Sequence, residues 1–436
     1  MRITTSRVLA VALLACAGCR ADHPAASAAP DSQRSSFRLA VQDRSNAAAS
    51  VAAYGQRIAV AWTASSESKS DIYLSVSTDN GATFGAPVRV NDVEGDARAS
   101  GEQPARVVMD KTIHVVWPTR QDSRTVLRYA SSTDDGRTFS KAATVAGDGL
   151  SGARGWHAAT LGYDHAVHIV WLDGRNAAPH QPGHVHGPST SLRAGTAKPS
   201  SGPREAPRQD VFHASWKLTE TGIGQRVENS VAANVCFCCK TAAATAGENV
   251  YVAWRHIYEG SIRDIAVSRS TDNGATFGAP IRVSEDGWKL DACPDDGPSM
   301  AADSHGGIHI AWPTLVVGTT PRKGIFYASL SSVTSLSGDV AFTPRLRLDS
   351  GEAAAAHPQL ASDDHGNVAV VWDEQVGGGR RIVVRRVSEG KARAPETFDG
   401  EGASYPVVAA ADGYWIVFWS AESAGKSVIE GRRLRF

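Results

Sequence analysis

The sequence lacks an excess of charge of either sign, because 45 Lys and Arg residues balance 45 Asp and Glu residues. It therefore has no basic surplus that would attract nucleic acid and no acidic tail. Long hydrophobic runs are also missing after the first residues, so no later segment is expected to span a membrane. The 436 residues have an ordinary soluble composition and suffice for one large β domain or two smaller domains.

The first 35 residues predict export. Two arginines precede a short apolar core, Val8–Ala15, which is too short to cross a bilayer. The following ACAGC resembles a bacterial lipobox, in which a Cys is lipidated and becomes the first mature residue. Residues 1–19 are thus expected to be a signal peptide ending at a lipidated Cys16 or Cys19, with a plain cleaved signal as the alternative. Residues 20–35, rich in Ala, Ser, Asp and Pro, predict a flexible tether.

These features predict a protein of the bacterial periplasm or cell surface. The protein would contact a membrane, the outer membrane, only through its lipid anchor. The oligomeric state stays open. The folded part would lie in an oxidising compartment.

A run of alternating apolar residues ending in Trp occurs seven times. The copies are Ile58–Trp62, Ile113–Trp117, Val167–Trp171, Val250–Trp254, Ile308–Trp312, Val368–Trp372 and Trp415–Trp419. β-Branched residues in period-two alternation predict strands. Most copies follow a small, Ala-rich segment that suits the innermost strand of a propeller blade, where the blades crowd around the axis.

Three turns share the pattern S-x-D-x-G-x-T-F: Ser77–Phe84, Ser132–Phe139 and Ser270–Phe277. Their Asp side chains can bond the turn backbone and their Gly residues can supply a positive φ, so we expect these carboxylates to be structural. The pattern is the Asp-box. Over roughly residues 37–436 the chain therefore resembles the sialidase-like Asp-box (BNR) repeat superfamily.

The repeats predict an all-β fold, a β-propeller of four-stranded blades. Seven repeats favour seven blades, and the six blades of known sialidases are the alternative. The last repeat, 406–436, ends after its third strand, whereas Phe37–Asp43 resembles the fourth strands. We expect this N-terminal strand to close the ring. Residues 36–436 then form one domain, with a loop insertion at about 176–209 that carries three histidines, His180, His184 and His186.

In this blade order the loops between strands two and three, and those between blades, lie on the face opposite the Asp-boxes. The residues just before the inner strands should ring the channel mouth on that face. They are Gln103, Trp156, Cys239, Gly297, His357 and Tyr405.

All four cysteines of the folded part map to this face: Cys236, Cys238, Cys239 and Cys293. Adjacent cysteines and Cys-x-Cys pairs make strained disulfides. Three interpretations stay open, and two structural disulfides are the favoured one. The others are a soft-metal site of thiolates for Cu(I) or Zn, and a redox site.

Sialidases hold a substrate carboxylate with three arginines and use a Tyr–Glu pair as nucleophile and an Asp as acid. No such arginine triad and no [FY]-R-I-P motif is recognisable here. The candidate catalytic residues are Asp173, Asp264, Glu374 and Tyr405. The candidate ligand-binding residues are Arg154, Trp156, Arg175, Arg255, His256, Arg263, Trp288 and His357.

A narrower resemblance lies in C-x-C-C-K-T followed by D-G-W-x-L-x-x-C-P, which is similar to a subset of exported bacterial Asp-box proteins. We expect the top face to bind a glycan or another extracellular ligand near the Cys cluster. The alternatives are a glycoside hydrolase of the sialidase type, and a soft-metal or redox site made by the four cysteines. Whether the protein is an enzyme stays open.

Overall fold

A computed structural model describes residues 36–436, apart from residues 68, 148–150, 178–207, 221, 291–294, 317–321 and 331–340. The predictions for the signal peptide, Cys16, Cys19, Cys293 and the three insertion histidines lie outside this range and stay predictions. The described part of the chain contains no helix of the length and apolar character that a membrane crossing requires.

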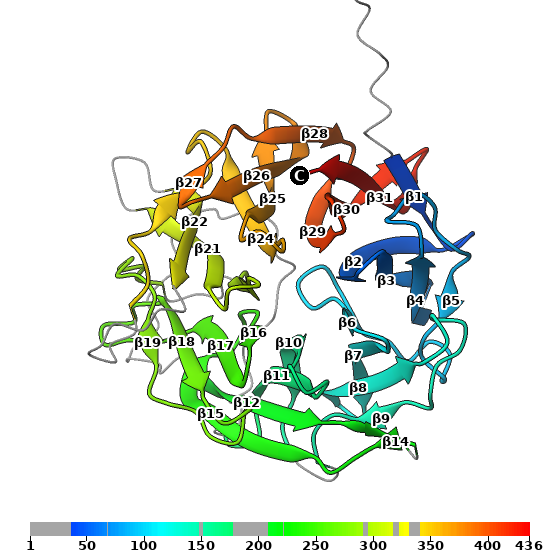
Figure 1. Ribbon diagram of the computed structural model, residues 1–436, viewed down its shortest axis with the longest axis horizontal. Helices are drawn as coiled ribbons and strands as arrows, with labels where there is room; N and C mark the ends of the chain where they lie inside the picture. Colours follow the sequence, from blue (N-terminus) through cyan, green and yellow to red (C-terminus); the bar gives the residue numbers. More distant parts are fainter. Residues whose placement is uncertain are drawn as a thin grey trace, which may run out of the picture. The chain divides into compact units, whose positions relative to one another are not determined.

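Seven four-stranded antiparallel sheets are arranged as the blades of a propeller around a central axis (Figure 1). Blade 1 comprises β2 (Ser45–Tyr54), β3 (Arg57–Ser66), β4 (Lys69–Ser77) and β5 (Val88–Arg89). Blade 2 comprises β6 (Arg106–Met109), β7 (Ile113–Gln121), β8 (Arg124–Ser132) and β9 (Ala143–Thr144). Blade 3 comprises β10 (Arg154–Leu161), β11 (Val167–Asp173), β12 (Arg208–Trp216) and β15 (Val227–Cys236).

Blade 4 comprises β16 (Ala242–Ala246), β17 (Asn249–Arg255), β18 (Ile265–Ser270) and β19 (Ile281–Arg282). Blade 5 comprises β20 (Ser299–Ala302), β21 (Ile308–Val316), β22 (Arg322–Leu330) and β23 (Leu346–Arg347). Blade 6 comprises β24 (Ala354–Ser362), β25 (Val368–Val376), β26 (Gly379–Ser388) and β27 (Lys391–Ala392). The predictions of an all-β propeller and of seven blades are confirmed.

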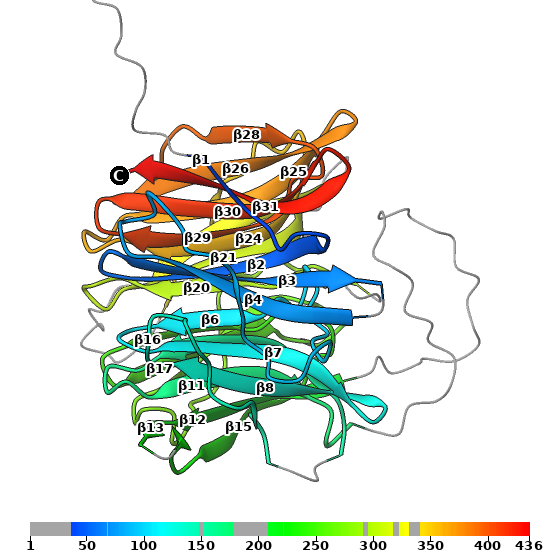
Figure 2. The same ribbon diagram turned by 90° about the vertical axis from the view of Figure 1, so that its right-hand side faces the viewer.

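Blade 7 takes strands from both ends of the described chain. It contains β29 (Ser404–Ala411), β30 (Tyr414–Ser423), β31 (Lys426–Arg435) and, as its outermost strand, β1 (Ser36–Leu39) (Figure 2). β1 pairs antiparallel with β31, so that Phe37 faces Gly431. The Phe37 ring packs against the rings of Phe84 and Phe418, at centroid distances of 5.3 and 6.0 Å. The predicted closure by an N-terminal strand is therefore confirmed.

The core lies between neighbouring blades. The Trp that ends each repeat is at most 1 % exposed. Trp117 of β7, for example, belongs to an apolar cluster with Ala59 and Leu74 of the preceding blade. Each Trp strand thus buries its large apolar side chains against an adjacent blade, which explains why the apolar pattern repeats.

The Asp-box turns have the hydrogen bonds expected from their sequence. In the first, Asp79 accepts bonds from the backbone N of Thr83 at 2.9 Å and from its hydroxyl at 2.6 Å, while Ser77 Oγ accepts from Gly81 N at 2.8 Å. The Thr83 hydroxyl is the main cause that lowers the pKa of Asp79 to about 2. Asn80, before the Gly, is also left-handed with φ 56°, a conformation that Asn tolerates well.

The outer strands depart from the regular repeat. In blades 1, 2, 4 and 5 the fourth strand has two residues, whereas β15 of blade 3 has ten. Blade 6 gains a further strand, β28 (Glu396–Gly400), which pairs with β26. A small hairpin of β13 (Leu218–Thr219) and β14 (Gly222–Ile223) precedes β15. Since β15 ends at Cys236, the long outer strand of blade 3 leads directly into the Cys cluster.

Candidate ligand-binding site at the channel mouth

Four inner strands carry a β-bulge at the same place. Each register shift contains a left-handed residue: Ala48, Trp156, His357 or Tyr405, with φ between 53° and 60°. A non-glycine residue in this region costs on the order of 1 kcal/mol and is often found at functional sites. The same strained position recurs in four blades, so the left-handed residues are a regular feature of the channel mouth.

The strand pairing fixes which residues occupy the predicted ring. Trp156, Gly297, His357 and Tyr405 stand at equivalent positions, two residues before the partner of the residue that precedes the repeat Trp. In the other two blades the prediction is wrong by one residue. Pro104 and Lys240 occupy the positions assigned to Gln103 and Cys239, because Arg106 pairs with Val116 and Ala242 pairs with Ala253.

His357 lies between two carboxylates that come from different parts of the ring. Its Nδ1 is 2.7 Å from Asp373 Oδ2 in its own blade, and its Nε2 is 3.0 Å from Glu102 Oε1. Glu102 stands on the segment before β6, which reaches toward the centre of the ring (Figure 1). One imidazole ring therefore joins blade 6 to the segment that leads into blade 2.

Lys240 extends the same network toward blades 4 and 5. Its Nζ lies 3.0 Å from Asp296 Oδ1 and 3.7 Å from Glu102 Oε2. Lys323 Nζ approaches the other oxygen of Asp296 at 3.7 Å. That oxygen also accepts the backbone N–H of His357 at 2.7 Å. Asp296 thus ties three blades together.

Tyr405 of blade 7 completes the network. Its ring lies against the His357 ring with centroids 4.1 Å apart, and its hydroxyl donates to Glu102 Oε1 at 3.4 Å. Its backbone N–H donates to Asp373 Oδ2 at 2.9 Å. Gly101 passes so close that a Cβ there would lie 2.4 Å from the Tyr405 ring. Only a glycine permits this approach.

Cationic groups outnumber anionic groups at the channel mouth. Among the described residues of this network three are carboxylates: Glu102, Asp296 and Asp373. The cations are Lys240, Lys323, Arg380, which bonds Asp373, and Arg106, joined by His357 when protonated. The carboxylates of Asp296 and Asp373 are buried, whereas the side chains of Arg380, Glu102 and Lys323 are 34 %, 16 % and 15 % exposed. The most exposed of these charged side chains is therefore a cation, Arg380.

The protonation states follow from these pairings. Burial alone would lower the pKa of His357, but Asp373, Glu102 and Asp296 outweigh it and raise the pKa to about 9. Burial raises the pKa of Asp373, and the charge of His357 overcomes this so that the net shift is downward. His357 is therefore a cation at neutral pH.

Below the mouth the channel encloses a cavity of about 430 Å³, lined by the inner strands of all seven blades. Arg106 lines this space and donates through Nε to the backbone O of His157 at 3.3 Å. Burial lowers the pKa of Arg106 to about 10, with Glu102 opposing the shift. Arg106 is partly exposed and lines the cavity, so an anion entering the channel would meet this residue.

The three candidate carboxylates lie inside their blades. Asp173 accepts bonds from Arg154 Nε at 3.1 Å and Arg175 Nη2 at 2.6 Å. Asp264 is held by Arg282 Nε at 3.0 Å, and Glu374 by Arg381 Nε at 2.8 Å. All three are buried. Their oxygen atoms are occupied by neighbouring side chains, and the ion pairs join strands within single blades.

The remaining ligand-binding candidates lie either within the blades, as the three carboxylates do, or at the channel mouth. Arg175 covers the Phe212 ring at 3.9 Å, within blade 3. His256 Nδ1 accepts from the Trp254 indole at 3.2 Å. Arg255 lies 4.8 Å from the centre of the buried Trp288 ring. Of the sequence candidates, the structure brings Trp156, His357 and Tyr405 to the channel mouth.

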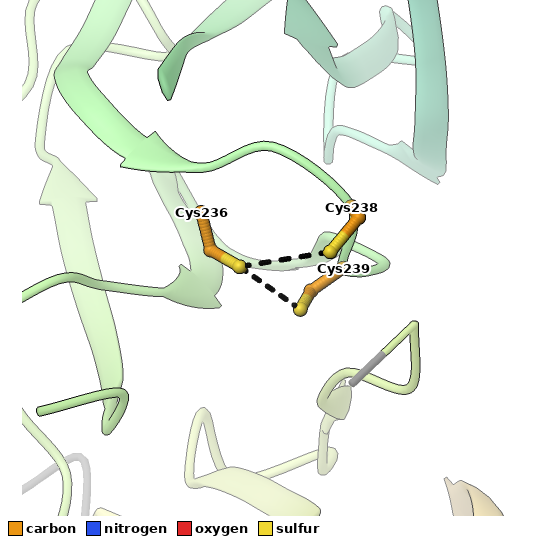
Figure 3. A group of neighbouring side chains, drawn as sticks. All are labelled: Cys236, Cys238 and Cys239. Carbon is orange, nitrogen blue, oxygen red and sulfur yellow. Dashed lines mark hydrogen bonds between the residues drawn. The ribbon is translucent and has the colours of Figure 1, made fainter. Parts of the chain in front are cut away.

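The cysteine cluster, Cys236, Cys238 and Cys239 (Figure 3), lies beside this mouth. The three cysteines are buried, and the partly buried Trp156, Phe237 and Ile257 pack against them. Cys236 Sγ is 3.9 Å from Cys238 Sγ and 3.4 Å from Cys239 Sγ. Cys238 is disulfide-bonded. Cys236 and Cys239 have free thiols, because their sulfur atoms are in contact and are not bonded. The structure thus departs from the expectation that all four cysteines form disulfides.

Sequence reasoning missed Glu102, Lys240, Asp296, Asp373 and Arg106. The first four of these residues are adjacent in sequence to a predicted ring residue or to a repeat Trp. Glu102 and Asp296 precede two predicted ring residues, Lys240 follows a third, and Asp373 follows a repeat Trp. A charge beside a predicted ring position was the available signal.

No family model matches the sequence, and no curated protein matches it. Solved structures share the fold. A PL25 ulvan lyase, a polysaccharide lyase, aligns with a TM-score of 0.54 and 10 % identity over 89 % of this chain and 93 % of its own. NanB sialidase from Streptococcus pneumoniae aligns at 0.47 and 11 % over 77 % and 67 %. The intramolecular trans-sialidase from Ruminococcus gnavus aligns at 0.47 and 10 % over 81 % and 94 %.

The chain is a seven-bladed β-propeller, and its fold resembles that of the ulvan lyase. At these identities the similarity concerns the fold alone, and the Cys-x-Cys-Cys resemblance stays a prediction.

Proposed function

We propose that the channel mouth of this propeller binds an anionic glycan. One observation carries the proposal: the described residues of the mouth hold more cationic than anionic groups, and two of the three carboxylates, Asp296 and Asp373, are buried whereas Arg380 is 34 % exposed. Such a surplus of positive charge attracts carboxylate or sulfate groups of a ligand, while the aromatic Trp156 and Tyr405 offer flat surfaces for sugar rings.

The fold similarity supports this choice of ligand class. The ulvan lyase has also been solved bound to the repeat -[GlcA(1-4)Rha3S]-, which contains a uronic acid, in a structure that aligns with a TM-score of 0.54 and 9 % identity. Export and lipid anchoring at Cys16 or Cys19 belong to the same proposal, because a surface-held binding protein would meet polymeric glycans outside the cell.

The test compares acidic and neutral oligosaccharides by isothermal titration calorimetry. We expect binding of a uronate-containing oligosaccharide, weaker binding at high salt, and none of the carboxyl-reduced counterpart. Lys323→Ala removes one accessible cation and should weaken binding about tenfold, or about 1.4 kcal/mol. Lys111→Ala, an exposed lysine on the opposite face, is the matched control. Equal binding of acidic and neutral sugars would contradict the proposal.

A second candidate is glycoside hydrolysis of the sialidase type. It is favoured by one contact, the 3.4 Å bond from the Tyr405 hydroxyl to Glu102, since a Tyr–carboxylate pair is the nucleophile of sialidases. A carboxylate can take the phenolic proton as the oxygen attacks. Release of the fluorophore from a fluorogenic sialoside, lost in Tyr405→Phe, would establish it. Binding without release would leave the first proposal alone.

A further inference from the structure

Within the part of the chain that the structure describes, two free thiols remain beside the disulfide-bonded Cys238. Cys236 and Cys239 are separated by two residues, and their Sγ atoms lie 3.4 Å apart. Each is 1 % exposed. A Cys-x-x-Cys pair with its sulfur atoms in contact needs little movement to form a bond, whereas the neighbouring spacings would strain one.

The charge around this pair is unusual. Arg263 Nη1 donates to Cys236 Sγ at 3.0 Å. Arg263 and its neighbour Arg255 are both 1 % exposed, and within the described residues no ion pair joins either to a carboxylate. Arg255 donates instead to backbone oxygens, among them Arg263 O at 2.8 Å. A buried guanidinium is costly without an anion, and a thiolate at Cys236 supplies one.

We propose that Cys236 and Cys239 form a redox-active dithiol that exchanges with small disulfides, with Cys236 as the attacking sulfur and Cys239 as the resolving one. The inference is independent of glycan binding. It assigns a chemical role to a cluster that the propeller repeat does not require.

The exchange balances as follows. The Cys236 thiolate attacks one sulfur of a small disulfide R–S–S–R, the S–S bond breaks, and one thiolate leaves. Cys239 then loses its proton to solvent and attacks Cys236 Sγ, which releases the second thiolate. The two cysteines give up two electrons, and the small disulfide is reduced to two thiols.

The acidities of the two thiols agree with these roles. The hydrogen bond from Cys239 is the main cause that lowers the pKa of Cys236 to about 6, and the charge of Arg263 helps against the opposing effect of burial. Burial raises the pKa of Cys239. One thiolate and one thiol thus coexist at neutral pH, as in other Cys-x-x-Cys pairs.

A soft metal is the competing use of the cluster, since the three described sulfur atoms lie within 4.8 Å of one another. A metal held by all three would require Cys238 to leave its disulfide. The two buried guanidinium groups would also repel a cation. Both observations favour exchange over metal binding, and the experiment separates the two.

The experiment treats the folded full-length protein, purified without added metal, with oxidised glutathione. Mass spectrometry of proteolysed samples should show a Cys236–Cys239 bond that dithiothreitol reverses. Cys239→Ser should stop halfway, with one glutathione on Cys236. Cys236→Ser should react at least about tenfold more slowly, because the remaining thiol is protonated. Alkylation of the wild-type protein by iodoacetamide should rise with a midpoint near pH 6.

Two outcomes would overturn the proposal. If both thiols react only after urea unfolds the chain, the pair is structural. If the purified protein carries near-stoichiometric copper or zinc that protects both thiols, the cluster is a metal site. Circular dichroism of each variant separates loss of reactivity from loss of folding. Glycan titrations of the same samples show whether the two sites fail together.

Discussion

The protonation of His357 gives the sharpest prediction for stability. Its pKa is raised from 6.5 to about 9 by Asp373, Glu102 and Asp296, which face the ring, against the opposing effect of burial. A group whose pKa is higher in the folded state adds stability that is complete below its unfolded pKa. That stability is lost as the pH rises through the folded pKa. The affected range is therefore pH 6.5 to 9.

The gap between these two pKa values corresponds to about 3 kcal/mol. We expect the free energy of unfolding, measured by urea denaturation and tryptophan fluorescence, to fall by about that amount between pH 6.5 and 9.5. His357→Gln should be less stable at pH 6.5 and should lack this fall. His165→Gln, which changes a side chain that is 72 % exposed, is the control and should behave like the wild-type protein.

Because other groups also titrate in this range, the comparison between variants decides the outcome. An equal fall in wild-type protein and His357→Gln would refute the argument, since His357 would then not be held as a cation. A histidine Cε1 proton signal that titrates near pH 9 would show directly, without unfolding the protein, that His357 is held as a cation.

Three further predictions concern separate parts of the ring. Asp79→Ala should cost about 1 kcal/mol in urea denaturation, and the wild-type contribution of Asp79 should be present above pH 3.8 and lost as the pH falls through about 2; a stability difference between the two proteins that persists below pH 2 would contradict this prediction. Phe37→Ala should lower the free energy of unfolding by about 2 kcal/mol, because its ring leaves Phe418, and a loss below 0.5 kcal/mol, roughly that of a surface change, would argue against closure by β1. Gly101→Ala should abolish glycan binding in calorimetry with little change in stability, because its Cβ displaces the Tyr405 ring.

The fold was predictable because two patterns recur along the sequence, one in the strands and one in the turns. Period-two alternation ending in Trp located strand two of every blade, and the three Asp-boxes located the turns after strand three. The segment at Phe37 resembles the fourth strand that the last repeat lacks, and this likeness located the closing strand. The elements that the sequence did not predict are the irregular ones. The two-residue outer strands and the additional β28 carry no side-chain pattern long enough to recognise.

The site was predictable only in part. Register placed Trp156, His357 and Tyr405 at the mouth, because their positions depend on the distance to the repeat Trp. Glu102 was not predictable in this way. It reaches His357, 255 residues away, from a segment without repeat structure. Contacts that depend on how a loop crosses the ring follow from three-dimensional packing.

The pairing of β1 with β31 also fixes the order in which the ring can be completed during synthesis. Arg38 and Glu430 form an ion pair at 3.0 Å although 392 residues separate them. β1 is therefore the first strand of the described chain to be translated and the last to find its partner. Until β31 has been made, Phe37 and the open edges of blades 1 and 7 stay exposed, and they are a hazard for association between nascent chains.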